Sequence, residues 1–149
     1  MQAKYSVRRA GPADLSPILA IERAGFGEWA WDRKLFAEYT RVCGDLFLVT
    51  EAGNKVVGYC IGRIARGAAS VESIAVAPSV RGTGAADALL RGLLRRFRAR
   101  GAGRVALMVK ESNLRARSFY ERYGFRRVRR VSKYYEDGEP GLLLHRDVE

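Results

Sequence analysis

The sequence predicts one mixed α/β domain, spanning 1–149, in which an antiparallel meander leads into a parallel crossover. Two β-rich runs within residues 46–65 are separated by the turn AGNK, which is typical of a hairpin, and a third run follows at 69–77. The amphipathic segment 85–100 then precedes a short apolar run at 104–109, as a crossover helix precedes a parallel strand. We therefore expect a central mixed sheet with helices on both faces.

The N-terminal elements come before the meander. Residues 4–10, KYSVRRA, alternate apolar and polar side chains like a strand. GPAD then opens a helix whose apolar residues include Leu15, Ile18 and Leu19. A second short helix is predicted over 32–42, with Asp32 as its N-cap.

The elements after the crossover follow from caps and turns. A helix begins at SNLRARSFYERYG, with Ser112 or Asn113 as its cap and Gly124 as its stop. Two further strands, at about 125–135 and 141–148, are joined by the polar turn EDGEPG.

The composition bounds the class of protein. A chain of 149 residues with 48% hydrophobic content can bury a core, and it has no apolar run of about 20 residues for a membrane span. The N-terminus lacks the apolar stretch of a secretory signal. Cys43 and Cys60 have neither metal-ligand spacing nor the count of a disulfide framework. We expect a cytoplasmic protein, monomer or homodimer, with reduced cysteines, no metal and no membrane partner.

The net charge is +11 and arginine supplies most of it. Such a surface attracts phosphate in nucleic acid or in an anionic cofactor. The basic residues are scattered from Arg8 to Arg146, so we expect mostly solvated faces and hold nucleic acid as the alternative partner. Arg91, Arg95 and Arg98 share a helix face that could meet a cofactor phosphate, RNA or solvent.

The turn RGTGAA, residues 81–86, lies between a predicted strand and a predicted helix. Its small residues let a ligand approach the backbone, and the first helical amides and the helix dipole favour phosphate or pyrophosphate. The alternative is a tight loop without a ligand. The chain contains no GxxxxGK[ST] motif, and Gly82 and Gly84 are followed by Asp87 where a dinucleotide fingerprint needs Gly or Ala.

IAVAPSVRGTGAADALL resembles the acyl-CoA-binding segment of the GCN5-related N-acetyltransferase (GNAT) superfamily, whose R/Q-x-x-G-x-G/A pattern is matched by Arg81, Gly84 and Ala86. VKESNLRARSFYERYGF is similar to the later segment of that family. The tail KYYEDGEPGLLLHRDV resembles the last hairpin of protein N-terminal acetyltransferases, particularly the ribosomal-protein alanine branch. The resemblance covers nearly the whole chain. It implies acetyl transfer from acetyl-CoA to a primary amine, and the acceptor that we expect is a protein or peptide N-terminus, including that of a ribosomal protein.

The resemblance also implies roles for individual residues. The backbone of one stretch would hold the pyrophosphate: Arg81, Gly82, Thr83, Gly84, Ala85 and Ala86. A strand segment would run beside the pantetheine: Ile74, Ala75 and Val76. The Val76 amide would polarise the thioester carbonyl, and Asn113 would contact the pantetheine arm. Tyr120 would protonate the departing thiolate, although its place on an apolar helix stripe also suits a core aromatic.

The general base departs from the family pattern. The ribosomal-protein branch carries an acidic residue in LEV, where this chain has LMV with Met108. Glu72 is one replacement, because period-two alternation would place it on the face of Ile74 and Val76; an exposed or salt-bridged Glu72 is the alternative. Glu28 matches loosely a substrate-contacting glutamate of related enzymes, and an ordered water is the third option.

Tyr134 and Tyr135 resemble the tyrosine pair that grips the acceptor's N-terminal residues in peptide-acetylating members, and aromatic packing within a strand is the alternative. Two further acceptors stay open, a small amine and a protein lysine, since one fold serves many reactions. A non-catalytic module that binds acyl-CoA or nucleic acid is the remaining hypothesis.

Overall fold

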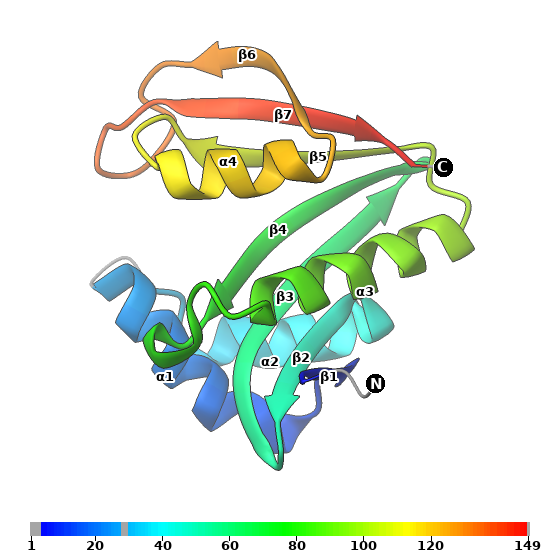
Figure 1. Cartoon of the computed structure of the whole chain (residues 1–149), viewed down its shortest axis with the longest axis vertical. Helices are drawn as coiled ribbons and strands as arrows, with labels where there is room; N and C mark the ends of the chain where they lie inside the picture. The colour runs from blue at the N-terminus through cyan, green and yellow to red at the C-terminus, as the bar shows by residue number, and fades with distance from the viewer. Residues whose placement is uncertain (1–3, 28–29, 149) are drawn as a thin grey trace.

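The computed structural model of the chain describes residues 4–27 and 30–148. Within them the chain forms seven strands and four α-helices around one mixed sheet, so the predicted fold class is confirmed (Figure 1). The strands are β1 Ser6–Arg9, β2 Phe47–Ala52, β3 Lys55–Ala65, β4 Ala68–Val76, β5 Arg104–Lys110, β6 Arg126–Val131 and β7 Gly141–Asp147. The helices are α1 Leu15–Phe26, α2 Arg33–Val42, α3 Ala85–Ala99 and α4 Leu114–Arg122.

The strand order is β1-β2-β3-β4-β5-β7-β6. The first four strands pair antiparallel in succession, β4 and β5 pair parallel across α3, and β7 lies antiparallel between β5 and β6. The predicted meander and the predicted parallel crossover are both present.

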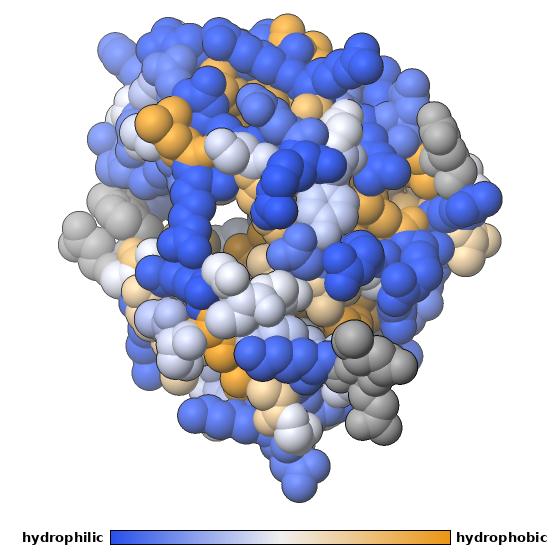
Figure 2. Space-filling view, viewed as in Figure 1, coloured by the Kyte–Doolittle hydropathy of each residue, from blue (hydrophilic) through white to orange (hydrophobic). Residues whose placement is uncertain are grey.

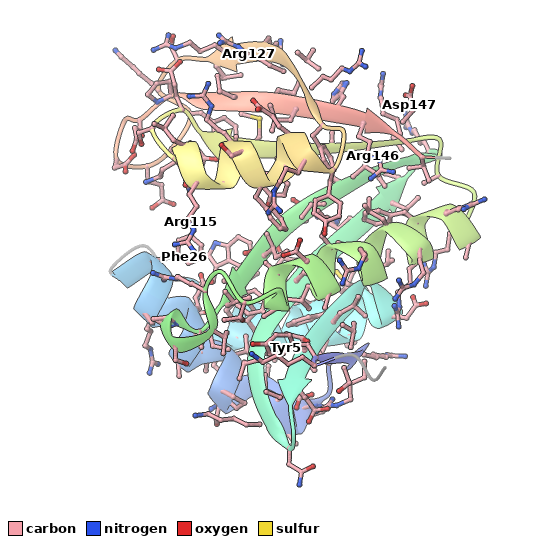
Figure 3. All side chains as sticks on the ribbon, in the orientation of Figure 1. Tyr5, Phe26, Arg115, Arg127, Arg146 and Asp147 are labelled. Atoms are coloured by element: carbon pink, nitrogen blue, oxygen red, sulfur yellow. The ribbon has the colours of Figure 1, made fainter. Side chains whose placement is uncertain are left out.

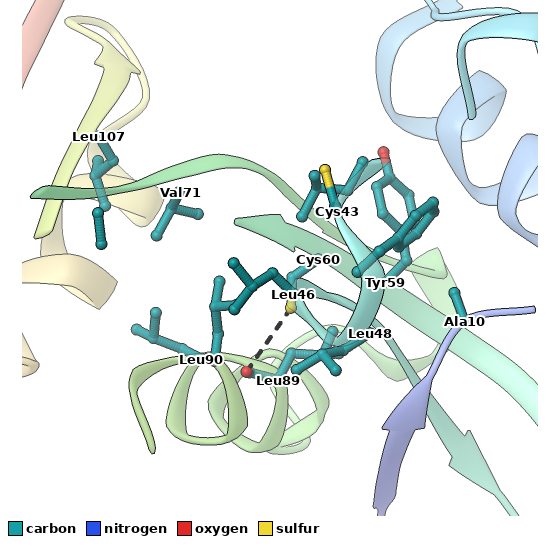
Figure 4. Packing of buried hydrophobic residues seen from close by; sticks show 14 of the residues in the cluster. Ala10, Cys43, Leu46, Leu48, Tyr59, Cys60, Val71, Leu89, Leu90 and Leu107 are labelled. Atoms are coloured by element: carbon teal, nitrogen blue, oxygen red, sulfur yellow. Dashed lines mark hydrogen bonds between the residues drawn. The ribbon is translucent and has the colours of Figure 1, made fainter. Parts of the chain in front are cut away.

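Helices cover both faces of the sheet. Gly62 faces α3, where an added Cβ would lie 2.6 Å from Phe97 Cζ. Tyr59, on the opposite face of β3, packs its ring 5.4 Å from that of Phe36 on α2. Figure 4 shows the α3 side of the core, where Leu89 and Leu90 meet strand residues and the Cys60 thiol points at the Leu89 carbonyl.

Local signals set most of the helix boundaries. Asp32 caps α2, its carboxylate accepting the Leu35 amide at 3.0 Å. Asn113 rather than Ser112 caps α4, since its Oδ1 accepts the Ala116 amide at 3.1 Å. Gly124 follows α4 with φ +84°, a conformation that glycine adopts without strain.

β6 is shorter than the sequence predicts. A strand was expected to reach residue 135, but β6 ends at Val131, and Lys133 has φ +52°. The Tyr135 amide donates to Glu139 and the Gly138 amide to Tyr135. Tyr134 and Tyr135 therefore lie in the β6–β7 connection, because the left-handed residue turns the chain out of the sheet before they are reached.

Among the described helices, none combines the length and the hydrophobicity that a transmembrane segment requires.

Candidate functional site

The site is built on a separation between β4 and β5. These strands pair only over Ala68–Val71 and Arg104–Leu107. Beyond this ladder β4 runs on to Val76 and β5 to Lys110, and the two diverge (Figure 1). The facing backbone groups of 72–76 and 108–110 therefore have no partner strand, which leaves them available to an extended ligand.

The Val76 amide points into this gap. The next residue, Ala77, donates its amide to the Val57 carbonyl of β3 at 2.7 Å. Because successive amides of an extended chain point to opposite edges, the Val76 and Ile74 amides face away from β3 and toward β5.

The glycine turn ends at the gap and begins α3. Gly82 has φ +75° and Gly84, the N-cap of α3, has φ +100°, so both adopt conformations that disfavour a side chain. The first helical amides, at Ala85 and Ala86, have no partner within the helix. Arg115 of α4 reaches the turn, since a Cβ added at Gly82 would lie 3.2 Å from its Nη2. Two arginines, Arg81 and Arg115, thus accompany the free amides.

Two of the backbone amides that were predicted to bind the pyrophosphate instead form hydrogen bonds within the turn. The Arg81 amide donates to the Pro78 carbonyl and the Thr83 amide to the Val80 carbonyl. The Thr83 hydroxyl bonds the Val80 carbonyl and the hydroxyl of Tyr5. The amides left for an anion are those of Gly82, Gly84, Ala85 and Ala86, and a diphosphate fits this donor set.

The gap opens on the molecular surface. Figure 2 shows an opening between the part of the molecule that carries α4 and the part that carries α3. In the same orientation, Figure 3 shows Arg115 extending from α4 toward Phe26 at the end of α1. A ligand lying on the glycine turn can therefore extend inward between β4 and β5.

Tyr120 of α4 has a buried ring and an available hydroxyl. The ring is 7% exposed and packs 5.2 Å from Phe119 and 5.6 Å from Phe125. Burial, with Cys60 and Tyr135 nearby, raises the pKa of Tyr120 well above the ordinary tyrosine value. No described residue hydrogen-bonds the hydroxyl, and none of the fully buried side-chain oxygens lacks a partner, so the hydroxyl is not sealed inside. Tyr120 is therefore a core aromatic that carries a neutral hydroxyl.

Glu72 lies on the wrong face for the role predicted from alternation. Gly62 pairs with Val71 and Ile61 with Ser73, so Glu72 is the extra residue of a β-bulge. Its carboxylate lies 3.2 Å from Ser70 Oγ and 3.9 Å from Arg63 Nε.

The bulge separates Glu72 from the residues whose face it was predicted to share. Glu72 influences the pKa values of Tyr39 on α2 and of Cys43, which places it on the α2 side. Val76 lies on the α3 side, where a Cβ added at Gly58 would touch both Val76 and Leu89. The predicted shared face is wrong, because the extra residue breaks the period-two alternation, and the base role loses its support.

Met108 occupies the position at which the ribosomal-protein branch carries an acidic residue. An added Cβ at Gly141 would lie 2.6 Å from Met108 Cε and 3.1 Å from Tyr134 Cδ2. The thioether therefore packs between β7 and the β6–β7 connection, and it cannot accept a proton.

The two predicted acceptor tyrosines lie together beside Met108. Tyr134 is 49% exposed, and its ring lies 4.9 Å from that of Tyr135. Burial raises the pKa of Tyr135 to about 12, and Lys110 Nζ lies 5.4 Å over its ring. Lys110 is held in turn by Asp137 at 2.6 Å. The structure thus places Tyr135 near Tyr120, with Tyr134 beside Tyr135, whereas Glu28 lies outside the described residues.

Sequence reasoning missed Glu22, a buried carboxylate on α1. It is 2% exposed, accepts the Trp31 amide at 2.8 Å and accepts the Tyr59 hydroxyl. The Tyr59 hydroxyl lies 3.4 Å from Ser73 Oγ on β4. Burial and then the Glu22 carboxylate raise the pKa of Tyr59. A signal existed, because Glu22 follows Ile18 by four residues on the apolar face of α1.

Glu22 links α1 to two other parts of the chain. It joins the helix to Trp31, just before α2, and to the central strand β3. Elsewhere in the described ranges, no three His, Cys, Asp or Glu side chains are arranged to hold a metal ion.

The chain is similar to known acetyltransferases along most of its length. The family described as Acetyltransferase (GNAT) family matches residues 16–125. An uncharacterized N-acetyltransferase of Methanocaldococcus jannaschii is 34% identical, over 93% of this chain and 88% of the relative. An N-alpha-acetyltransferase of Sulfolobus acidocaldarius is 30% identical, over 94% of this chain and 90% of the relative.

Solved structures show the same architecture. The crystal structure of Ard1 from Thermoplasma volcanium matches with a TM-score of 0.93 and 26% identity, over 99% of both chains. The ribosomal-protein-S18-alanine N-acetyltransferase from Escherichia coli matches with a TM-score of 0.85 and 25% identity, over 97% of this chain and 94% of that one.

Proposed function

Since the chain belongs to the acetyltransferase (GNAT) family, we propose that it transfers the acetyl group of acetyl-CoA to the α-amine of a protein or peptide N-terminus. The observation that carries the proposal is the gap between β4 and β5, with the glycine turn at its entrance and the Val76 amide facing it. The N-alpha-acetyltransferase relative supports an α-amine as the acceptor.

The residues present suit acetyl-CoA. The amides of Gly82, Gly84, Ala85 and Ala86 would bind its diphosphate, with Arg81 and Arg115 as counter-charges. The free edges of 72–76 and 108–110 would bind the pantetheine arm as a third strand binds its neighbours. Asn113 keeps its amide nitrogen for this arm, because its oxygen is committed to the α4 cap. Acetyl-CoA supplies an acetyl group activated as a thioester.

The chain's own groups then assist direct transfer. The acceptor amine nitrogen attacks the thioester carbonyl, the C–N bond forms and the C–S bond breaks. The Val76 N–H would stabilise negative charge on the carbonyl oxygen. Tyr120, which its raised pKa keeps protonated, would donate a proton to the departing sulfur and regain one from the attacking nitrogen, which loses its second proton as the amide forms.

The acceptor's ammonium must lose a proton before attack, and Met108 cannot accept it. We assign this proton to an ordered water rather than to Glu72, which lies on the α2 side of the sheet. Tyr134 and Tyr135 would hold the first residues of the acceptor, and Glu28 is proposed to complete that contact.

The test measures thiol release from acetyl-CoA with three acceptors: peptides with a free N-terminus, peptides with a blocked N-terminus and an internal lysine, and a polyamine. Only the first should support turnover. Turnover confined to lysine peptides or to the polyamine would replace the proposed acceptor. Binding of acetyl-CoA without turnover on any of the three would favour the non-catalytic module.

Tyr120→Phe tests the proton donor. We expect kcat to fall about 10²-fold, because the ring remains while the donor is lost. Tyr123→Phe is the matched control: it removes a hydroxyl that bonds Asp87 at 2.6 Å on the α3 side, and kcat should be unchanged. A Tyr120→Phe enzyme as fast as the parent would exclude the acid role.

A further inference from the structure

The net positive charge is concentrated in one stretch of the chain. Residues 81–132 contain 15 Lys and Arg against three Asp and Glu, a net charge of +12. Residues 1–80 contain 10 against eight, a net charge of +2. The basic stretch forms α3, β5, α4 and β6, and β7 lies between the two strands in the sheet.

Several of these arginines line two surface hollows, one on either side of α4. A hollow of about 330 Å³ lies between α3 and β7, and another of about 290 Å³ lies between α4 and β6. Figure 2 shows that hydrophilic residues cover much of this face. Figure 3 marks Arg146 on β7 and Arg127 on β6. We call the arginines that line the two hollows the arginine surface: Arg91, Arg95, Arg98, Arg117, Arg126, Arg127 and Arg146.

The positive charges of the arginine surface have almost no acidic partners among the described residues. None of its members takes part in the ion pairs found among the described residues. Glu121 is the one acidic residue lining the two hollows within this part of the chain. Like charges at four-residue spacing, as at Arg91 and Arg95, destabilise a helix slightly. Counter-charge from a partner would remove this repulsion.

The arginine surface is set apart from the glycine turn. Arg91 and Arg98 follow Gly84 by seven and 14 residues, which is about 10 and 21 Å along a helix. The arginines that accompany the turn are Arg81 and Arg115, which do not line either hollow.

We propose that the arginine surface binds the phosphate backbone of RNA. Arginine presents a planar fork that pairs with phosphate oxygens, and an array without carboxylate partners suits a polyanion better than a single ion. Half-buried Tyr123, between Arg91 and Arg146 in the larger hollow, adds an aromatic face. The choice of RNA rests on the proposed function, because an α-amine first becomes available on a chain that is leaving the ribosome.

The arginines gather on one face of the fold, although the sequence predicts scattered and mostly solvated charges. Along the sequence the basic residues look scattered, but the fold brings helix α3, helix α4 and the C-terminal hairpin to one face. A partner surface is thus formed from segments more than 50 residues apart, Arg91 and Arg146 among them.

The experiment measures binding of a fluorescent RNA hairpin by anisotropy over a range of salt concentrations, with the full chain. The variant Arg95→Glu/Arg98→Glu is compared with Lys34→Glu/Lys55→Glu, which changes the net charge equally on the other half of the molecule. We expect the first variant to bind about 10- to 100-fold more weakly, with a log Kd against log salt slope reduced by about 2. The second should stay within about twofold of the parent.

Several outcomes would overturn the proposal. They are equal weakening by both variants, tighter binding of a DNA duplex or of polyglutamate than of RNA, and loss of RNA binding at saturating coenzyme A. The last would assign these arginines to the cofactor. Acetylation of a free peptide is measured on the same variants: RNA binding without peptide acetylation refutes the proposed function, and the reverse refutes only this inference.

Discussion

The two halves of the sheet, which separate after Val71 and Leu107, are built differently. In the β1–β4 half, Phe36, Phe47 and Tyr59 are fully buried. In the other half, the edge strand β6 is exposed along nearly its whole length and is rich in arginine. Large buried rings therefore join the first half to its helices, whereas the outer edge of the second half carries charge at its surface. The site lies where they part, so it takes a rigid strand edge from one half and α4 from the other.

The largest expected effect compares one apolar truncation in each half. Phe36→Ala should cost about 3–5 kcal/mol of unfolding free energy, because the ring is fully buried against Phe47 and Tyr59. Val128→Ala on β6, where the side chain is 50% exposed, should change it by less than about 0.5 kcal/mol. Urea denaturation of the two variants measures both values. Similar losses in the two halves would contradict the contrast.

A smaller effect is expected for Tyr59→Phe, which removes one hydrogen bond from buried Glu22. Leaving that carboxylate short of a donor should cost about 1–3 kcal/mol. If Glu22 positions the α1–α2 connection, KM for the acceptor should rise while KM for acetyl-CoA stays unchanged.

Tyr39→Phe is the matched control for this prediction, since its hydroxyl makes no hydrogen bond within the described residues and its ring packs beside Trp31. Equal changes in the two KM values of Tyr59→Phe would show that Glu22 serves stability alone.

The next effect depends on pH. Burial raises the pKa values of Tyr59 and Tyr120, so both stay neutral in the folded protein while an unfolded tyrosine ionises near pH 10. The stability that the two neutral hydroxyls contribute is fully present below pH 10. Above pH 10 the free energy of unfolding falls by up to about 1.4 kcal/mol per pH unit for each group. Between pH 8.5 and pH 10.5, the free energy of unfolding should therefore decrease less for Tyr120→Phe than for the parent. Identical slopes would mean that the Tyr120 hydroxyl is more solvated than its surroundings indicate.

The smallest effect concerns Glu72. Its carboxylate contacts Ser70 and Arg63 at a partly exposed position, so Glu72→Gln should change stability by less than about 1 kcal/mol. The pH–rate profile should keep its shape if water accepts the acceptor's proton. A flattened rising limb would restore Glu72 as the base.

Most of the fold could be predicted because its signals are local. The hairpin turn, the caps at Asp32 and Asn113 and the glycine stop at Gly124 each depend on a few neighbouring residues. The end of β6 could not be predicted, because the aromatic residues Tyr134 and Tyr135 are typical of a strand while the backbone turns at Lys133.

The predicted cradle and the predicted base illustrate the same limit within the site. Gly82 and Gly84 have the positive φ angles that a glycine turn indicates. The face of Glu72 depended on how β4 pairs with β3, and a bulge at that residue reversed it. Glu22 could be noticed on its apolar helix face, but its partners Tyr59 and Trp31 come from other parts of the chain.

The order of the elements, the glycine turn and the absence of a titratable side chain at Met108 can be inferred from the amino-acid sequence, because they follow from residue identity and short-range backbone preference. The face of Glu72, the burial of Glu22 and the gathering of the arginines depend on the folded chain. Each of these depends on strand register or on packing between residues distant along the chain, and no local preference specifies such contacts.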